Sequence, residues 1–242
     1  MTLGTLRFGN MHRTMREDDS HRGGSSGIGF AIARAFGQAS ASRIIILGRR
    51  PGPLREARVK LMTELKAAGS KAALGGFKRE KIEIDVLVMN AAALGADTVI
   101  LESGVEDVWT DYVTNVRTLL DFASFFSKQG LSKSKNSGAL LLQQIAKDTK
   151  VEDMQIINFH PGSILTQSAR SKGYTEDNWA WDHEDMPGHF AVWAASAEAS
   201  FLHGRFIWAR WDVDELRSGE LRERIDNDPY FLKIGVIGAT GN

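Results

Sequence analysis

Four short apolar runs constrain the fold of this chain more than any other feature. The first, Arg43–Gly48, contains four consecutive large aliphatic residues and therefore has no polar face to turn toward water. Similar runs occupy Ile84–Ala91, Met154–His160 and Gly204–Trp211. Runs of this length and composition are typical of parallel strands that helices cover on both faces.

Helical patterns occupy much of the chain between these runs. After a glycine-rich stretch that begins at Gly23, small and aliphatic residues recur at helical spacing and predict a helix with a narrow apolar face. Further helices are predicted over Pro51–Ala68, Val105–Phe126, Ser137–Asp148 and Gly188–Ala199. Strands that alternate with helices predict an α/β fold with a doubly wound parallel sheet.

Length and charge narrow the class of protein. The 242 residues suit one α/β domain, which we expect over residues 22–242 after a poorly ordered N-terminal arm at 1–21. Because 30 Lys and Arg balance 30 Asp and Glu, we expect a small-molecule substrate and neither nucleic acid nor a membrane as partner. The chain has no cysteine and no apolar stretch of about 18 residues, which favours a cytoplasmic protein.

The glycine-rich stretch has the spacing of a phosphate-binding loop. Gly23, Gly27 and Gly29 allow a tight turn, a close approach of the backbone to a pyrophosphate, and close packing of the following helix. The N-terminus of that helix would face the phosphates. A buried strand is expected to lead into such a loop, yet residues 15–21 are polar.

Four motifs in this order resemble the short-chain dehydrogenase/reductase family. They are the stretch Gly23–Gly29, the run Asp85–Ala92, Asn115 within a long helix, and the segment Pro161–Thr166 after a strand. The resemblance covers roughly residues 22–237. It implies a Rossmann-type domain that uses NAD(H) or NADP(H) to oxidise alcohols or reduce carbonyls, commonly as a homodimer or homotetramer.

The resemblance also implies site residues. Asn115 matches a helix asparagine that holds a water in the family's proton relay; its alternative role is helix packing. Arg22 and Met89 depart from the pattern, since a threonine and an asparagine are usual there. The cofactor-binding positions that match are Gly23, Ser25, Gly27, Ile28, Gly29, Asn90, Ala91, Pro161, Gly162, Ile164 and Thr166.

The end of the first apolar run points to NADP(H) rather than NAD(H). An acidic residue there would accept the ribose hydroxyls of NAD, but the sequence continues Gly48-Arg49-Arg50. A guanidinium suits a 2′-phosphate, so Arg49 is the predicted contact. The alternative is that both arginines are simply solvated.

The catalytic pair of the family is incomplete. A tyrosine four residues before a lysine normally protonates the developing alkoxide, and the lysine lowers its pKa. Counting back four residues gives Gln129 from Lys133 and Leu131 from Lys135, and neither side chain is an acid. We assign Lys135 to the lysine position; its alternative is a solvated loop lysine.

Three strands of the expected sheet are weak or missing. Only Thr5–Phe8 could precede the glycine loop as a first strand, and Ser70–Gly76 is a poor third strand. Only ten residues, most of them polar, separate Phe126 from Ser137, which leaves no room for a fifth strand with its catalytic serine. We expect no metal site, because Pro187 disrupts helical geometry between His183 and His189.

Two interpretations therefore stay open at the level of sequence. The first is an NADP(H)-dependent oxidoreductase that acts on a carbonyl or a secondary alcohol, with Asn115 and Lys135 as the surviving relay residues. The second is a catalytically inactive family member, either a pseudoenzyme or a truncated gene product, that at most binds nucleotide or oligomerises. Loss of a general acid typically lowers a rate by 10²- to 10⁴-fold, which favours the second.

Overall fold

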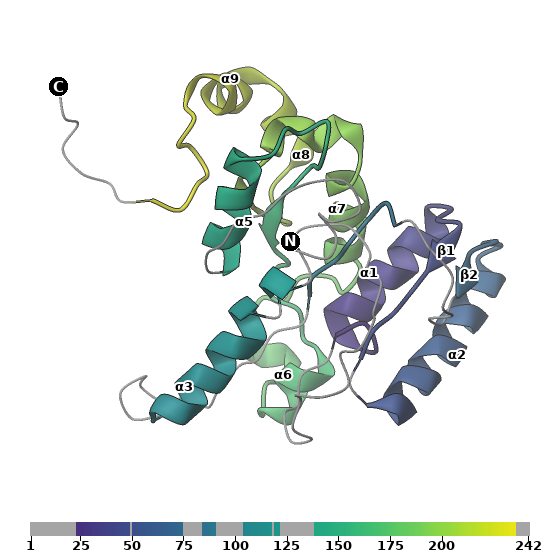
Figure 1. Cartoon of the computed structure of the whole chain (residues 1–242). Coiled ribbons are helices and arrows are strands. Elements are labelled where there is room, and N and C mark those ends of the chain that lie inside the picture. Colours follow the sequence, from purple (N-terminus) through teal and green to yellow (C-terminus); the bar gives the residue numbers. More distant parts are fainter. Residues whose placement is uncertain are drawn as a thin grey trace.

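Helices surround a few short parallel strands in the computed structural model of the chain (Figure 1). It describes residues 23–48, 50–74, 84–90, 104–117, 119–121 and 138–235. The strands are β1 (Arg43–Ile44), β2 (Ala73–Leu74), β3 (Asn158–His160) and β4 (Phe206–Trp208). The α-helices are α1 (Gly27–Gln38), α2 (Pro51–Ala67), α3 (Val105–Tyr112), α5 (Gly138–Lys147), α6 (Gln167–Ser171), α7 (Met186–Ala194), α8 (Val213–Arg217) and α9 (Gly219–Asn227).

The strands form two separate parallel pairs within the described part of the chain. In one pair Arg43 of β1 lies opposite Ala73 of β2; in the other, Asn158 of β3 lies opposite Phe206 of β4. The α/β class and the parallel pairing are thus confirmed, and the third strand is as weak as predicted. The apolar run at 84–90 belongs to neither pair, although the sequence predicts a strand there. A strand requires a hydrogen-bonded neighbour, and apolar composition alone does not supply one.

Several predicted elements are shorter or divided. The helix predicted over Val105–Phe126 begins at Val105 but changes to a π-helical turn, η1, over Val113–Arg117. The helix predicted over Gly188–Ala199 ends at Ala194 and is followed by a 3₁₀ helix, η3 (Ala197–Leu202). The break falls at Ser196, whose hydroxyl donates to the Trp193 carbonyl at 2.7 Å and so competes with the helical hydrogen bonds.

Helix α1 is buried on more than the narrow face that its sequence predicts. Ile32 packs into the largest core cluster with Phe159, Phe190 and Ile207, between α7 and the β3–β4 pair. On another side Phe30 joins a second cluster with α2 and β1. A Cβ at Gly188 would lie only 2.8 Å from the Ala31 carbonyl oxygen, so small residues let α7 approach α1 at backbone distance.

An ion-pair network on α1 bridges the same two neighbours. Arg34 is paired with Glu64 of α2 at 3.2 Å and with Asp185 at the start of α7. Burial alone would lower the pKa of Arg34, but the two carboxylates outweigh burial and raise its pKa above the ordinary value. The helix is therefore joined to both sides of the molecule by charge as well as by apolar packing.

Arg205, just before β4, holds the C-terminal segment by backbone contacts. The residue is 7% exposed, and its guanidinium donates to the carbonyl oxygens of Ile225 at 2.5 Å, Asp228 at 3.3 Å and Phe231. Burial lowers the pKa of Arg205, while the nearby Asp228 carboxylate opposes this shift. The planar guanidinium suits this role because it presents several donors in a fixed geometry.

We predict that Arg205→Met destabilises the fold, because one buried and two partly buried carbonyl groups lose a charged donor. The expected loss is about 3 kcal/mol in the free energy of unfolding, or a fall of roughly 6–12 °C in Tm. Differential scanning fluorimetry measures this change. Arg217→Met is the matched control, since Arg217 is 45% exposed and its ion pairs lie at the surface. Equal melting temperatures for the two variants would contradict a stabilising role of the Arg205 hydrogen bonds.

Candidate functional site

The glycine loop is attached to the end of the first apolar run. The Gly24 N–H donates to the Leu47 carbonyl at 2.9 Å. Helix α1 begins four residues after Gly23, and its N-cap residue Ser26 makes no side-chain capping hydrogen bond. The first-turn N–H groups therefore receive no cap from that hydroxyl, and these are the donors that bind phosphate at a helix N-terminus.

Gly29 is required for the close packing of α1 on the loop. A Cβ at this position would overlap the Gly23 carbonyl oxygen and would lie 2.8 Å from the Asn90 side-chain nitrogen. Any side chain would therefore push the helix away from the loop. The same approach places Asn90, at the end of the 84–90 run, directly beside the glycines.

Gly27 lies against Thr166, so the segment that contains Thr166 joins the glycine loop and Asn90. The φ of Gly27 is +54°, a left-handed value that favours glycine, and a Cβ there would lie 3.3 Å from the Thr166 Cγ2. Thr166 caps α6, because its hydroxyl accepts from the Ala169 N–H at 3.2 Å. The loop, Asn90 and Thr166 thus converge beyond the carboxyl ends of three apolar runs, where doubly wound folds bind ligands.

Asp182 fixes the segment that leads to Thr166. Its carboxylate accepts from the Ser163 N–H at 2.7 Å, and its own N–H donates to the Ser163 carbonyl at 2.8 Å. Arg210 pairs with the same carboxylate at 3.4 Å. Gly162, with φ +90°, has no room for a side chain because a Cβ would lie 2.7 Å from that carboxylate. Sequence reasoning missed Asp182, since no motif links it to a segment 19 residues away.

The remaining predicted cofactor positions are placed as follows. Ile28 packs against the largest core cluster, and Pro161 is half-buried after β3. The Ile164 carbonyl accepts from the Thr166 N–H at 2.7 Å. The Ser25 hydroxyl lies 3.7 Å from where a Cβ on Gly48 would be. Ser25 therefore sits beside the Gly48 corner that precedes Arg49.

The predicted catalytic residues are only partly covered by the structure. Asn115 is half-buried within the π-helical turn η1. Lys135, Arg49 and Ala91 lie outside the described residues. Their roles stay predictions from the sequence.

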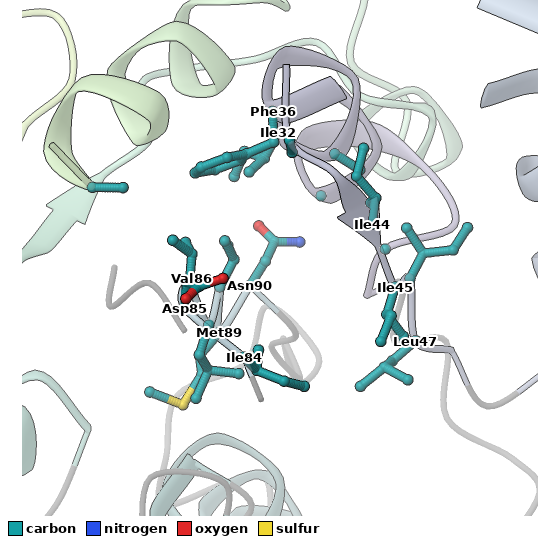
Figure 2. A pocket seen from close by; sticks show the side chains of 18 of the residues that line it. Ile32, Phe36, Ile44, Ile45, Leu47, Ile84, Asp85, Val86, Met89 and Asn90 are labelled. Atoms are coloured by element: carbon teal, nitrogen blue, oxygen red, sulfur yellow. The ribbon is translucent and has the colours of Figure 1, made fainter. Parts of the chain in front are cut away.

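A cavity of about 540 Å³ lies below the glycine loop (Figure 2). Ile44, Ile45 and Leu47 line one side of it and Ile84, Val86 and Met89 the other, with Ile32 and Phe36 of α1 across one end. The cavity extends along the apolar runs, whereas a dinucleotide binds beyond their carboxyl ends. Gly23, Gly29 and Asn90 also line it, so the cavity adjoins the edge at which the loop, Asn90 and Thr166 converge.

Two features are absent from the described residues. These residues contain no helix long and apolar enough to cross a membrane. They also contain no group of three or more His, Asp or Glu side chains arranged to hold a metal ion.

Sequence similarity to characterised relatives shows the family of this chain. No protein-family model matches it. A short chain dehydrogenase/reductase of Aspergillus novofumigatus is 31% identical over 254 residues, which cover 89% of this chain and 87% of the relative. Another, of Claviceps purpurea, is 30% identical over 253 residues, which cover 89% and 84%. The chain belongs to the short-chain dehydrogenase/reductase family.

Solved structures of this family share the fold. L-sorbose reductase from Gluconobacter frateurii, complexed with NADPH and L-sorbose, superimposes with a TM-score of 0.58 at 18% identity, covering 77% of this chain and 92% of the reductase. A variant of actinorhodin polyketide ketoreductase with NADPH gives 0.57 at 13% identity, with coverage of 77% and 92%. The fold of this short-chain dehydrogenase/reductase is therefore of the Rossmann type, with an interrupted sheet in its described part.

We predict that Gly29→Ala abolishes stabilisation by nucleotide, because the added methyl group separates α1 from the loop and from Asn90. The Tm rise expected with about 1 mM NADPH falls to zero, and overpacking costs about 1–3 kcal/mol. Gly52→Ala is the control, since a Cβ there has nothing within 4 Å. A Gly29→Ala variant that keeps the full NADPH-dependent shift would show that this contact does not form the site.

Proposed function

We propose that this short-chain dehydrogenase/reductase binds NADP(H) at the edge formed by the glycine loop, Asn90 and Thr166. The observation that carries the proposal is the convergence of these three segments at one edge. A Cβ at Gly29 would overlap the loop and press on Asn90, and the left-handed φ of Gly27 disfavours any side chain there, so the backbone is held close to where a pyrophosphate would lie. The bound cofactor would supply or accept hydride at its nicotinamide ring.

The proposed cofactor is NADP(H) rather than NAD(H), on two grounds. Gly48 is followed by Arg49 and Arg50, and Ser25 of the glycine loop lies beside Gly48. A guanidinium at that corner would bind a 2′-phosphate through charge-assisted hydrogen bonds. The two solved relatives described above also contain NADPH.

We predict that Arg49→Ala weakens NADPH binding at least tenfold and leaves NADH binding within about twofold, because only NADPH carries the 2′-phosphate. Isothermal titration calorimetry with each nucleotide measures the two affinities. Arg55→Ala, an exposed change on α2, is the matched control. Equal losses for NADPH and NADH would contradict the 2′-phosphate contact, and no binding of either nucleotide would overturn the proposed function.

The proposed reaction is hydride transfer to or from a carbonyl or secondary alcohol of a small molecule. Asn115 would hold a water, and the Lys135 ammonium would favour the ionised form of a neighbouring acid. The alkoxide that develops on a reduced carbonyl needs a proton donor within hydrogen-bond reach. Asp182 would act indirectly, because it fixes the backbone between β3 and Thr166 from the neighbouring segment.

A second candidate function is nucleotide binding without turnover. The observation that favours it is the residue four positions before each candidate lysine: Gln129 for Lys133 and Leu131 for Lys135. Neither an amide nor an alkyl side chain can donate a proton to an alkoxide at neutral pH. Under this alternative the protein retains the cofactor edge and lacks the chemical step.

The second candidate function predicts negligible NADPH-dependent carbonyl reduction by the unaltered protein and a rise of about 10²-fold with Leu131→Tyr, since the phenol restores a general acid beside Lys135. The loss of NADPH absorbance with a panel of small ketones measures the rate. Leu131→Phe is the control, because it adds the ring without the hydroxyl. Rapid turnover by the unaltered protein would place the acid elsewhere in the chain.

We also propose that the protein assembles as a homodimer or homotetramer. One side of α3 supports this proposal, because Val105, Val108, Trp109 and Tyr112 recur at helical spacing and are between 38% and 83% exposed. The Trp109 and Tyr112 rings stack at 5.5 Å, which creates a flat apolar surface. Exposed apolar patches of this kind typically mark protein–protein interfaces.

A further inference from the structure

Charge is distributed unevenly over the described residues, although the whole chain has no net charge. Residues 43–48 and 50–74, which contain β1, α2 and β2, carry seven Lys or Arg and two Glu. The other described residues carry twelve Lys or Arg and 21 Asp or Glu. The first group therefore has a net charge of +5 and the second a net charge of −9. We call the first group the basic unit and the second the acidic part.

The basic unit is one compact part of the molecule. Its two strands pair with each other, and Leu61 and Leu65 of α2 pack into one core cluster with Ile44 of β1. Figure 1 shows α2, β1 and β2 on one side of the molecule, with α1 between them and α7. The positive charges are thus gathered on one side and do not alternate with the negative charges over the surface.

The cations of the basic unit are exposed, and few are neutralised by neighbours. Within the described residues only Lys60 of this unit pairs with a carboxylate, at 3.7 Å from Glu64. The same carboxylate also pairs with Arg34 of α1 at 3.2 Å, so it offsets little of the charge on α2. The six other exposed cations are Arg43, Arg50, Arg55, Arg58, Lys66 and Lys71.

The basic unit adjoins the edge proposed to bind the cofactor. The Gly24 N–H donates to the Leu47 carbonyl at 2.9 Å, and α2 begins at Pro51, just beyond the Gly48 corner. The helix has 17 residues and is therefore about 26 Å long, which places Lys66 roughly 22 Å from its start. One guanidinium at the corner suffices to contact a 2′-phosphate, so the cations farther along α2 have no role as direct contacts.

The acidic part has the opposite effect on an anionic ligand. Glu106 and Asp107 lie in the first turn of α3, and Asp214 and Glu215 lie in the first turn of α8. The pyrophosphate of NADP(H) carries about two negative charges, and its 2′-phosphate adds nearly two more. Such a ligand is attracted by one side of the molecule and repelled by the other.

We propose that the basic unit steers NADP(H) electrostatically toward the edge formed by the glycine loop, Asn90 and Thr166. This proposal rests on the proposed function, because it takes NADP(H) as the ligand of that edge. Charges beside a site raise the rate of association without touching the bound ligand. NADPH gains more than NADH, since the attraction grows with the charge of the ligand. The basic unit thus accelerates the approach of the cofactor, whereas the contact proposed for Arg49 retains it.

Screening by salt decides when steering is measurable. Arg55 and Arg58 lie about 6 Å and 11 Å along α2 from its start, and so roughly 15 Å from a nucleotide at the loop. Two charges at this distance from an anion of about four charges alter the association rate roughly tenfold at 0.01 M ionic strength, where the Debye length is about 30 Å. At about 0.15 M the same two charges alter the rate only about twofold.

Stopped-flow mixing of the full-length protein with NADPH tests the proposal, with the fluorescence of the bound nucleotide as the signal. The double variant Arg55→Gln, Arg58→Gln should associate roughly tenfold more slowly than the unaltered protein at about 0.01 M ionic strength. The two proteins should associate equally fast at about 0.5 M, and their dissociation rates should agree within about twofold at both salt concentrations.

The matched control removes two exposed cations from the acidic part, in the double variant Lys147→Gln, Lys150→Gln. His203 joins the Ala146 and Thr149 carbonyls to the Ile156 N–H just before β3, so this segment lies at the amino end of β3. The glycine loop lies at the opposite, carboxyl edge. The control should therefore slow NADPH association by no more than about twofold at low salt.

Three outcomes overturn the proposal. Equal association rates for the two double variants at low salt would show that the basic unit does not steer the cofactor. Slow association of Arg55→Gln, Arg58→Gln that persists at high salt, or a faster dissociation, would show a direct contact instead of steering. No NADPH binding by the unaltered protein would overturn the proposed function as well, whereas the first two outcomes leave it intact.

A second measurement needs no variant. The association rate of NADPH with the unaltered protein should fall at least about fivefold between 0.01 M and 0.5 M salt, and that of NADH should fall less. A protein of zero net charge with evenly mixed surface charges would show almost no such dependence. Association rates that do not change with salt for either nucleotide would also contradict steering.

Discussion

The approach of α1 to the glycine loop is the contact on which the rest of the structure depends. Gly29 allows it, since any Cβ there would overlap the Gly23 carbonyl and press on Asn90. The approach places the N-terminus of α1 at the carboxyl ends of apolar runs that are far apart in the sequence. Without it, Thr166 and Asn90 would have no common neighbour, and the edge at which we propose nucleotide binding would not exist.

The described core is organised around helices more than around a continuous sheet. Its two strand pairs are not joined by a ladder, and the 84–90 run, which belongs to neither pair, contributes side chains to the core. Helix packing compensates: small residues at the α1–α7 contact let the two backbones come close, and dense apolar packing follows on either side. An interruption of the sheet between these pairs is therefore compatible with a well-formed core at each end.

Residue spacing in the sequence predicted individual helices and strands of this structure. The spacing of Ala31, Ile32 and Ala35 predicted α1, and the aliphatic run at 43–47 predicted β1, although the strand covers only Arg43 and Ile44. The sequence also grouped Gly27, Gly29, Asn90 and Thr166 through a family resemblance, and the structure places them together; their role toward a cofactor stays a prediction. The sequence analysis did not predict two features that depend on long-range contacts. These are the hydrogen bonding of Asp182 to Ser163 and the burial of α1 on more than one face. Neither depends on a periodic pattern, because each arises when segments distant in sequence meet.

The Arg34 network has a mechanical consequence. One guanidinium links α2 to the first turn of α7, so the half of the molecule that contains β1 and β2 is tied to the half that contains β3 and β4 through a single helix. Hinge motion between the halves would stretch ion pairs and apolar contacts on α1 at the same time. The glycine loop leads directly into that helix, so a change in the relative orientation of the two halves would also move the edge proposed to bind nucleotide.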